Sequence, residues 1–406
     1  MNVLIVGSGA REHALAWKLV QSAQLDELHA APGNPGMAQL GRCHPIREDD
    51  VEGLLGLCRQ HEIHLVVIGP EAPLVAGVAD ELRRAGVPVF GPSKAAARIE
   101  GSKAFAKEIM EAASVPTAAL LDEARAPCVV KADGLAAGKG VFVCRTQEEV
   151  DSALARARAL NGSVLVEELL EGEEVSLFAL SDGQRVLPLP PLQDFKRLRD
   201  GDQGPNTGGM GSYSPVPFVG DEDIEEIAGI VHRPVIAELA RRGNHFVGLL
   251  YAGLILTEAG PCVLEFNCRF GDPETQALVP RIEGDLLGAL AACAQAELEG
   301  VDLEVGPTAA VAVVLAAPGY PDAPEAGMAI GGTEVVSATG TLVFQAGTAL
   351  RHGELVASGG RVLTVVGTGD SIADARDQAY SGVEHIDFPG AQYRRDVAAK
   401  AVHVPG

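Results

Sequence analysis

The chain has 406 residues, of which 47% are hydrophobic and 21% charged, and its formal net charge at pH 7 is -23. A chain of this length exceeds what one hydrophobic core usually supports, so we expect two to four domains. The acidic balance disfavours binding to nucleic acid or to an anionic membrane surface, because both are negatively charged. A site for a small anion must therefore be a local cluster of Lys, Arg and backbone N–H groups.

The first hundred residues alternate short β-rich runs with amphipathic helical runs. The predicted strands are 2–6, 28–31, 65–68 and 87–90, and the predicted helices are 12–21, 51–60 and 76–85. This alternation is typical of a doubly wound parallel sheet. Turns rich in Gly and Pro follow all four strands, at the carboxyl edge where such sheets bind ligands. We therefore predict a ligand site at that edge.

From residue 102 the pattern changes to that of a small α+β lid followed by a core. The predicted elements are a helix 103–113, a β unit around 128–143 with a Gly-rich loop, a helix 148–160, strands 164–168 and 174–180, a helix 224–242, strands 249–256 and 262–267, a β-rich tail 309–363 and a helix 372–386. The polar, Gly-rich stretch 193–214 is too long for a passive connection, so we predict a binding loop there.

The sequence also bears on location, redox state and metals. It begins without a basic leader, and no apolar run approaches the roughly 18 residues of a spanning helix, so we expect a cytoplasmic protein. Its seven cysteines include no C-x-x-C pair, which favours reduced packing residues. His61 and His64 lack the H-E-x-x-H spacing that sets two imidazoles on one helix face, which disfavours a metal there.

The first glycine-rich motif is Gly7-Ser8-Gly9-Ala10-Arg11-Glu12, directly after the first strand. Two glycines at this point let the backbone approach a phosphate at a helix N-terminus. The dinucleotide fingerprint fails, because its third glycine position holds Glu12 and no acid follows the second strand. We favour a monophosphate on a substrate, with a NAD site or a plain tight turn as alternatives.

The second glycine-rich motif runs from Lys131 to Val141 and is not a Walker A loop. A Walker A loop has four residues between its first glycine and its Gly-Lys pair, whereas only three lie between Gly134 and Gly138-Lys139 here. Gly140 then follows the lysine in place of the Ser or Thr of Walker A. We predict a mobile hairpin whose backbone N–H groups and Lys139 close over a polyphosphate, with Lys131 fixed on the preceding strand. The alternative is an exposed hairpin with ordinary lysines.

The third motif is an apolar strand that runs into an acidic hinge over residues 164–175. Taken alone it favours a solvated turn. Beside a polyphosphate loop, however, Glu167 could accept from an adenine amino group, the Leu170 backbone could meet the ring, and Glu174 could hold ribose hydroxyls.

The fourth motif places Glu265 and Asn267 two residues apart on a strand, hence on one face. Two oxygen ligands on one face, with waters and phosphate oxygens completing the shell, commonly hold magnesium. Arg269 follows on the same face and could clamp a carboxylate or acyl phosphate with its planar fork. The alternative is an alternating surface strand, with Phe266, Cys268 and Phe270 facing inward.

Taken in chain order, these motifs resemble the nucleotide site of the ATP-grasp superfamily. Within it, the chain resembles the glycinamide ribonucleotide synthetase family over nearly its whole length. The strings that carry the resemblance are GSGAREH (7–13), APGNPG (31–36), GPEAPL (69–74), GSKAF (101–105), KADGLAAGKG (131–140), GPNTGGMGSYS (204–214) and EFNCRFGDPET (265–275).

The resemblance implies an ATP-dependent carbon-nitrogen ligase that joins glycine to 5-phosphoribosylamine through glycyl phosphate, in purine biosynthesis. Another ATP-grasp carboxylate-amine ligase is the main alternative; an oxidoreductase and a non-catalytic nucleotide-binding module are weaker ones. ATP would be a co-substrate, with Mg2+ or Mn2+ on Glu265 and Asn267. The partners would be small molecules, with no nucleic acid and no membrane. We expect a monomer, and transient contact with the enzyme that supplies phosphoribosylamine is left open.

The resemblance also implies a multidomain α/β and α+β chain with the ATP-grasp fold. Its expected parts are a Rossmann-like domain (1–101), an ATP-grasp core (102–115 and 179–304), a lid (116–178) and a small β-rich C-terminal domain (305–406).

The residues carried over by the resemblance form three further groups. Expected catalytic residues are Arg269, Lys139 and Asp194. Expected ATP-binding residues are Lys103, Lys131, Gly138, Lys139, Gly140, Glu167, Leu170 and Glu174. Expected substrate-binding residues are Gly9, Arg11, Glu12, His13, Asn206, Thr207, Gly208, Gly209, Met210 and Asp272.

Three positions depart from the pattern of the family or superfamily. Phe195 and Gln345 stand where the family has His. The chain therefore has no histidine at these two positions to which a catalytic role could be assigned. Gly253 stands where many other ATP-grasp enzymes carry an additional acidic metal ligand. The ligands of a second metal ion therefore stay open.

Overall fold

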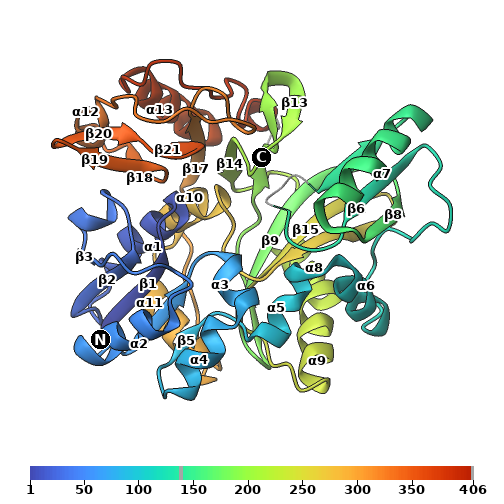
Figure 1. Ribbon diagram of the computed structural model, residues 1–406, viewed down its shortest axis with the longest axis horizontal. Coiled ribbons are helices and arrows are strands. Elements are labelled where there is room, and N and C mark those ends of the chain that lie inside the picture. The colour runs from blue at the N-terminus through green and yellow to red at the C-terminus, as the bar shows by residue number, and fades with distance from the viewer. Residues whose placement is uncertain (137–139, 404–406) are drawn as a thin grey trace.

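The computed structural model describes residues 1–136 and 140–403 of the chain. Figure 1 shows an N-terminal domain that carries the C-terminal region on one side, and a lid that projects away from both. Because the lid and the two terminal regions face a common centre, residues far apart in sequence can meet there.

The N-terminal domain is a five-stranded parallel sheet of order β3-β2-β1-β4-β5. Its strands are β1 (Asn2–Gly7), β2 (Glu27–Pro32), β3 (Arg42–Cys43), β4 (Leu65–Ile68) and β5 (Val89–Phe90). Its helices are α1 (Ala10–Leu19), η1 (Met37–Gln39), α2 (Val51–Gln60), α3 (Glu71–Ala76), α4 (Val78–Arg84) and α5 (Lys94–Gly101).

Alternate residues of β1 enter two different hydrophobic cores. Leu4 packs in the cluster that holds Leu54 of α2, whereas Ile5 packs in the cluster that holds Leu15 of α1. Helices therefore cover both faces of the sheet, which confirms the predicted doubly wound class.

The lid is a three-stranded antiparallel sheet of order β7-β6-β8 covered by one helix. Its elements are β6 (Cys128–Ala132), β7 (Val141–Cys144), α7 (Gln147–Asn161) and β8 (Val164–Glu168). It has a small hydrophobic core of its own, in which Val130 packs with Val150 and Ala157. The predicted α+β lid is therefore present as a separately packed unit.

The core domain contains a four-stranded antiparallel sheet of order β10-β9-β15-β16. Its strands are β9 (Glu173–Asp182), β10 (Val186–Pro188), β15 (Val247–Thr257) and β16 (Gly260–Asn267). Its helices are α6 (Lys103–Ala112), α8 (Asp221–Ile227), η3 (Ala228–His232), α9 (Arg233–Arg241), α10 (Glu274–Leu278), η4 (Val279–Arg281) and α11 (Leu286–Gln295). The helix predicted over 224–242 begins three residues earlier and includes the π-helical segment η3.

The predicted binding loop 193–214 is more ordered than the sequence indicated. It contains β11 (Gln193–Asp194), the hairpin β12 (Arg197–Arg199) and β13 (Gln203–Asn206) with η2 (Asp200–Asp202), and β14 (Gly211–Ser214). β14 pairs with β17 about a hundred residues later, for example Ser212 with Ala312. Because these strands are short and their partners are distant, periodicity in the sequence does not show them.

The C-terminal region completes this sheet, whose order is β11-β14-β17-β21-β18. Its remaining elements are β17 (Ala309–Ala316), α12 (Thr333–Ala338), β18 (Leu342–Gln345), β19 (Thr348–Arg351), β20 (Glu354–Ala357), β21 (Arg361–Gly369), α13 (Ile372–Glu384) and η5 (Ala401–His403). The predicted substrate residues 206–210 thus lie at the end of β13 and in the turn that leads into β14 of this sheet. In the described part of the chain, no helix is long and apolar enough to cross a membrane.

Candidate active site

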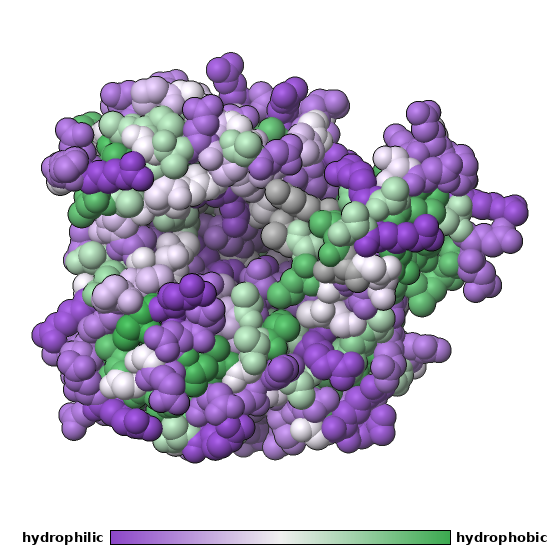
Figure 2. Space-filling model, viewed as in Figure 1, coloured by the Kyte–Doolittle hydropathy of each residue, from purple (hydrophilic) through white to green (hydrophobic). Residues whose placement is uncertain are grey.

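A hollow opens on one face of the molecule between the lid, the N-terminal domain and the C-terminal region. Figure 2 shows that the floor of this hollow is hydrophilic. The predicted ATP residues of the lid and core and the predicted substrate residues of the N-terminal domain come from the elements around it (Figure 1).

A buried charge cluster joins the lid to the core. Lys131 on β6 lies 2.6 Å from Glu167 Oε2 on β8, and its Nζ also donates to the Leu264 carbonyl on β16 at 2.8 Å. Lys107 on α6 lies 3.2 Å from Glu167 Oε1. The Glu167 side chain is only 2% exposed. It therefore holds two lysines in place, a contact that the sequence motif did not indicate.

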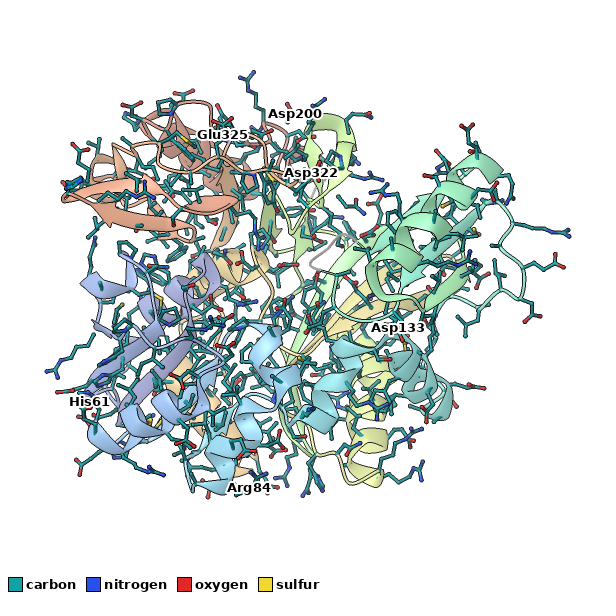
Figure 3. All side chains as sticks on the ribbon, in the orientation of Figure 1. His61, Arg84, Asp133, Asp200, Asp322 and Glu325 are labelled. Carbon is teal, nitrogen blue, oxygen red and sulfur yellow. The ribbon has the colours of Figure 1, made fainter. Side chains whose placement is uncertain are left out.

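Lys103 stands at the start of α6, where Asp133 from the lid holds the helix end. Asp133 Oδ1 accepts from the Lys103 backbone N–H at 2.7 Å, and Lys103 Nζ donates to the Gly134 carbonyl at 3.0 Å. Burial lowers the pKa of Lys103, and the carboxylate of Glu265 opposes this shift. Figure 3 shows Asp133 at the base of the lid. Two lysines, Lys103 and Lys131, are thus fixed near the lid hinge.

A second charge cluster surrounds Lys196, which the sequence analysis did not single out. Its Nζ lies 2.9 Å from Glu174 Oε2 and 3.1 Å from Asp194 Oδ1. Burial alone would lower the pKa of Lys196, but these two carboxylates raise it well above its usual value. Lys196 therefore stays charged, and the predicted catalytic Asp194 and ribose-binding Glu174 meet at one cation.

A protonatable carboxyl group lies next to this cluster. Glu274 is 4% exposed, and its Oε1 accepts from the Tyr251 hydroxyl at 2.7 Å. The Tyr251 hydroxyl also lies 2.8 Å from Ser176 Oγ. Burial and the nearby Asp194 carboxylate raise the pKa of Glu274 from 4.5 to about 7. A carboxyl group with such a pKa exchanges its proton near neutral pH.

Arg269 is held between two carboxylates of the N-terminal domain. Its Nε lies 3.1 Å from Glu71 Oε2, and its Nη2 lies 3.2 Å from Glu100 Oε1. Although burial alone would raise the pKa of Glu71, Arg269 and Arg11 lower it to about 2. Glu71 and Glu100 thus hold the guanidinium from two sides, and a guanidinium held in this way can bind an anion in a fixed orientation.

The residues expected to hold a divalent cation fit that role by their chemistry. Glu265 and Asn267 are partly exposed, whereas Phe266 between them is 3% exposed, so the two oxygen-bearing side chains share one face of β16. Oxygen ligands are those that Mg2+ and Mn2+ prefer. Glu265 pairs with Gly253 on β15, which offers no side-chain ligand. Glu265 and Asn267 are therefore chemically suited to bind a hard divalent cation such as Mg2+.

The polar groups of the turn after β1 bond mainly to other groups of the chain. Glu12 Oε2 accepts from the Gly9 N–H at 2.7 Å, which caps α1, and Arg11 Nε lies 2.6 Å from Glu12 Oε1. Arg11 Nη1 also donates to the Phe270 carbonyl at 3.1 Å. The Gly9 amide and Arg11 thus already have partners, so an incoming phosphate would have to share or replace these bonds.

His13 joins the N-terminal domain to the C-terminal region. Its Nδ1 accepts from the Gln345 N–H at 2.9 Å, and its ring packs edge-on against Phe344 with 5.5 Å between centroids. Burial lowers the pKa of His13 to about 4, so the imidazole is neutral at pH 7. Its observed contacts therefore serve the junction between the two parts.

Arg361 on β21 is a contact residue that no sequence motif indicated. Its Nη1 donates to the Gly208 carbonyl and to the Asp272 carbonyl, both at 2.6 Å, and its Nη2 lies 3.3 Å from Asp272 Oδ2. Arg361 also lowers the pKa of Asp272 against the effect of burial. Arg361 thus fixes two of the predicted substrate segments relative to each other.

The remaining residues of the turn 206–210 connect it to its surroundings. Asn206 Nδ2 donates to the Val141 carbonyl of the lid at 3.3 Å, and Thr207 Oγ1 donates to the Lys196 carbonyl at 2.9 Å. Gly209 donates its N–H to Thr207 Oγ1 at 3.0 Å, and Met210 is fully buried. The turn therefore contacts both the lid and the Lys196 cluster.

Gly138 and Lys139 lie outside the described residues. Gly140 is buried, and its carbonyl accepts from the Ala132 N–H at 2.8 Å. Leu170 is partly exposed in the turn between β8 and β9.

The overall fold is shared with enzymes that have different sequences. The biotin carboxylase domain of Hydrogenobacter thermophilus 2-oxoglutarate carboxylase superposes with a TM-score of 0.69 at 18% identity, covering 97% of this chain and 91% of that one. Residues 101–275 match the model of an ATP-grasp domain, so the chain is an ATP-grasp enzyme. Residues 1–100, 101–275 and 310–400 match the N domain, the ATP-grasp (A) domain and the C domain of phosphoribosylglycinamide synthetase. The chain therefore belongs to the phosphoribosylglycinamide synthetase family.

Full-length relatives agree with this assignment. The chain is 49% identical over 417 residues to the phosphoribosylamine-glycine ligase of Streptomyces coelicolor and 47% identical over 419 residues to that of Rhizobium meliloti, with 99% of each chain covered. The crystal structure of phosphoribosylamine-glycine ligase from Thermotoga maritima has a TM-score of 0.86 and 36% identity, covering 98% of this chain and 100% of that one. The family inferred from the sequence strings is confirmed.

Proposed function

We propose that this protein joins the carboxylate of glycine to the amine of 5-phosphoribosylamine, giving glycinamide ribonucleotide, ADP and phosphate. The carrying observation is the match of all three family domains, together with identity close to one half over the full length of relatives with this activity. The reaction is the second step of de novo purine synthesis, and we place it in the cytoplasm.

Catalysis in this site rests mainly on positioning and charge neutralisation, because glycine's carboxylate is a weak nucleophile that the triphosphate repels. Lys103 and Lys131, both fixed by hydrogen bonds, are proposed to bind the ATP phosphates. Glu265 and Asn267 would hold Mg2+ or Mn2+, which supplies further neutralisation of phosphate charge. The proposed ATP set also retains Gly138, Lys139, Gly140, Glu167, Leu170 and Glu174.

Glycine's carboxylate attacks the γ-phosphate, which forms glycyl phosphate and releases ADP. Arg269 is proposed to orient the carboxylate and then the acyl phosphate, because Glu71 and Glu100 hold its guanidinium rigidly. Asp194, next to Lys196, is proposed to help place the incoming amine. Phosphate leaves when the amine attacks the acyl carbon, and the amine loses its proton.

The amine substrate is proposed to bind between the N-terminal turn and the segment fixed by Arg361. Asp272 Oδ2 lies 3.5 Å from the position that a Cβ atom would take at Gly9, so these two segments are adjacent. The proposed substrate set is Gly9, Arg11, Glu12, His13, Asn206, Thr207, Gly208, Gly209, Met210 and Asp272. Arg11 would exchange part of its bonding with Glu12 for the 5-phosphate.

The test is ADP release with glycine and freshly generated phosphoribosylamine, each omitted in turn. We expect sustained ADP release only with both substrates and a divalent cation. Other amino acids and amines serve as matched controls for a different ATP-grasp ligase. Equal or faster turnover with another acid and amine pair would contradict the proposed substrates.

We propose that the enzyme acts as a monomer and that its domain limits are 1–101, 102–115 with 179–304, 116–178 and 305–406. Sedimentation at several concentrations tests the first point. Phosphoribosylamine is unstable, so transient contact with the enzyme that supplies it is also proposed. A higher yield of product from the two enzymes together than from phosphoribosylamine added at the same flux would support that contact.

A further inference from the structure

Three histidines from separate segments meet on the N-terminal domain. His29 is on β2, His44 follows β3, and His61 is the residue directly after α2. One ring nitrogen of each lies within 4.8 Å of the others. His29 Nδ1 and His44 Nε2 are 3.0 Å apart, and the rings of His29 and His61 have centroids 4.6 Å apart. We call this set the histidine cluster.

Glu27 orients the central member of the histidine cluster. Its Oε2 lies 3.2 Å from His29 Nε2, and His29 itself is fully buried. A neutral His29 that donates its Nε2–H to this carboxylate has its Nδ1 lone pair directed toward His44. A histidine that binds a metal through one nitrogen commonly donates its other N–H to a carboxylate in this way.

The charges around the histidine cluster also permit a cation. Arg42 is a positive neighbour of His29 and His44, but it is 63% exposed and its Nη2 lies 3.7 Å from Glu27 Oε1, which partly compensates its charge. Burial lowers the pKa of His29 and His44, and their imidazole neighbours lower it further. These shifts favour the neutral form of His29 and His44, which is the form that binds metal ions.

We propose that the histidine cluster binds one borderline divalent transition-metal ion of the Zn2+ type through His29, His44 and His61, with a fourth position open to water. Two nitrogens bound at about 2.05 Å in a tetrahedral shell are about 3.3 Å apart. His29 and His44 already have nearly that spacing. His44 and His61 are only partly buried, so their rings can turn to complete the site.

This site is distinct from the ATP and substrate residues. Figure 3 shows His61 on the outer edge of the N-terminal domain, on the opposite side of the molecule from Asp133. Imidazole ligands favour Zn2+, Cu2+ and Ni2+, whereas the proposed ligase cation uses oxygen ligands. The ion would tie β2, the end of β3 and the end of α2 together.

The test titrates the full-length protein with Zn2+ by calorimetry, with excess Mg2+ present to occupy oxygen-ligand sites. The variants are His44→Gln and His61→Gln, and the matched control is His64→Gln, whose Nδ1 accepts from the Asn2 N–H at 2.9 Å outside the cluster. We expect one equivalent of Zn2+ on the unaltered protein and the control, and at least about tenfold weaker binding in each of the two variants.

A second readout is the Cu2+ electron paramagnetic resonance spectrum, which should show coupling to three imidazole nitrogens and lose one in each variant. Unfolding temperature without Zn2+ checks that the variants fold. If one variant does not fold, the other decides. Undiminished Zn2+ binding in a folded variant overturns the three-histidine site, as does an equal loss in His64→Gln.

Discussion

Replacing Glu167 by Gln tests whether the buried charge cluster holds the lid. The carboxylate contacts Lys131 at 2.6 Å and Lys107 at 3.2 Å, and its side chain is 2% exposed. Removing one partner of a buried ion pair leaves uncompensated charge and typically costs about 3 to 5 kcal/mol. We expect this loss to appear as easier opening of the lid, because the cluster spans β6, β8 and α6.

Hydrogen exchange of the Lys103 and Ala104 amides, which donate to Asp133 of the lid, measures this opening directly. A loss of about 3 kcal/mol corresponds to exchange roughly a hundredfold faster. The control is Glu171→Gln, an exposed acid in the turn after β8, which should leave exchange unchanged. Adding Lys107→Met to Glu167→Gln should recover part of the loss, since one buried charge is then absent. A change below about 0.5 kcal/mol in Glu167→Gln would refute the reasoning.

Three further predictions concern the substrate and core residues. Arg11→Ala should raise the apparent KM for phosphoribosylamine by about ten- to a hundredfold and leave the KM for ATP nearly unchanged, because a charge-assisted hydrogen bond contributes roughly 1.5 to 3 kcal/mol. If the KM for ATP rose selectively instead, the turn would belong to the nucleotide site. Arg361→Met should loosen the turn held near Asp272 and raise the same KM by about tenfold, while kcat for ATP-dependent turnover at saturation changes little; an unchanged KM would remove its positioning role. For Glu274, burial raises the pKa from 4.5 to about 7, so its contribution to stability is fully present below pH 4.5 and is lost as pH rises through 7. Unfolding measured without added divalent cation should therefore lose up to roughly 3 kcal/mol over this window, and Glu274→Gln should lose less; parallel pH profiles of the two proteins would contradict the assignment.

The parts of the fold with strong local periodicity could be predicted from the sequence. The parallel sheet of the N-terminal domain follows from apolar runs such as 65–68, which are buried on both faces. The face shared by Glu265 and Asn267 follows from the two-residue period of a strand, and the burial of Phe266 agrees with it. In both cases the pattern of residues that are neighbours in the sequence is enough to predict the structure.

Contacts between distant segments could not be predicted in this way. Arg361 is 153 residues from Gly208, and Lys107 is 60 residues from Glu167, so no local pattern relates either pair. Lys196 lies two residues after Asp194, in none of the strings that carry the family resemblance, and only the structure shows that it bridges Asp194 and Glu174. The side chains that hold a candidate site residue are therefore visible only in the structure.

The two positions where this chain lacks the family's histidine can be understood from their contacts. Gln345 meets the N-terminal domain through its backbone: its N–H donates to His13 Nδ1 at 2.9 Å, and its carbonyl accepts from Asn34 Nδ2 at 2.8 Å. Its side chain turns to Thr348, whose hydroxyl donates to Gln345 Oε1 at 3.0 Å. Since any residue offers the same backbone groups, the junction does not depend on an imidazole at this position.

Phe195, next to the predicted catalytic Asp194, also makes packing contacts in place of a histidine. The Arg394 guanidinium lies 4.8 Å from the Phe195 ring centroid, and the ring of Tyr213 lies 6.3 Å away. Arg394 is 1% exposed and pairs with Asp396 and Asp202. An aromatic ring therefore covers a buried cation here, a contact that a charged imidazole would weaken. At this position the chain uses the ring for packing, and the carboxyl group near Asp194 whose pKa is raised to about 7 is that of Glu274.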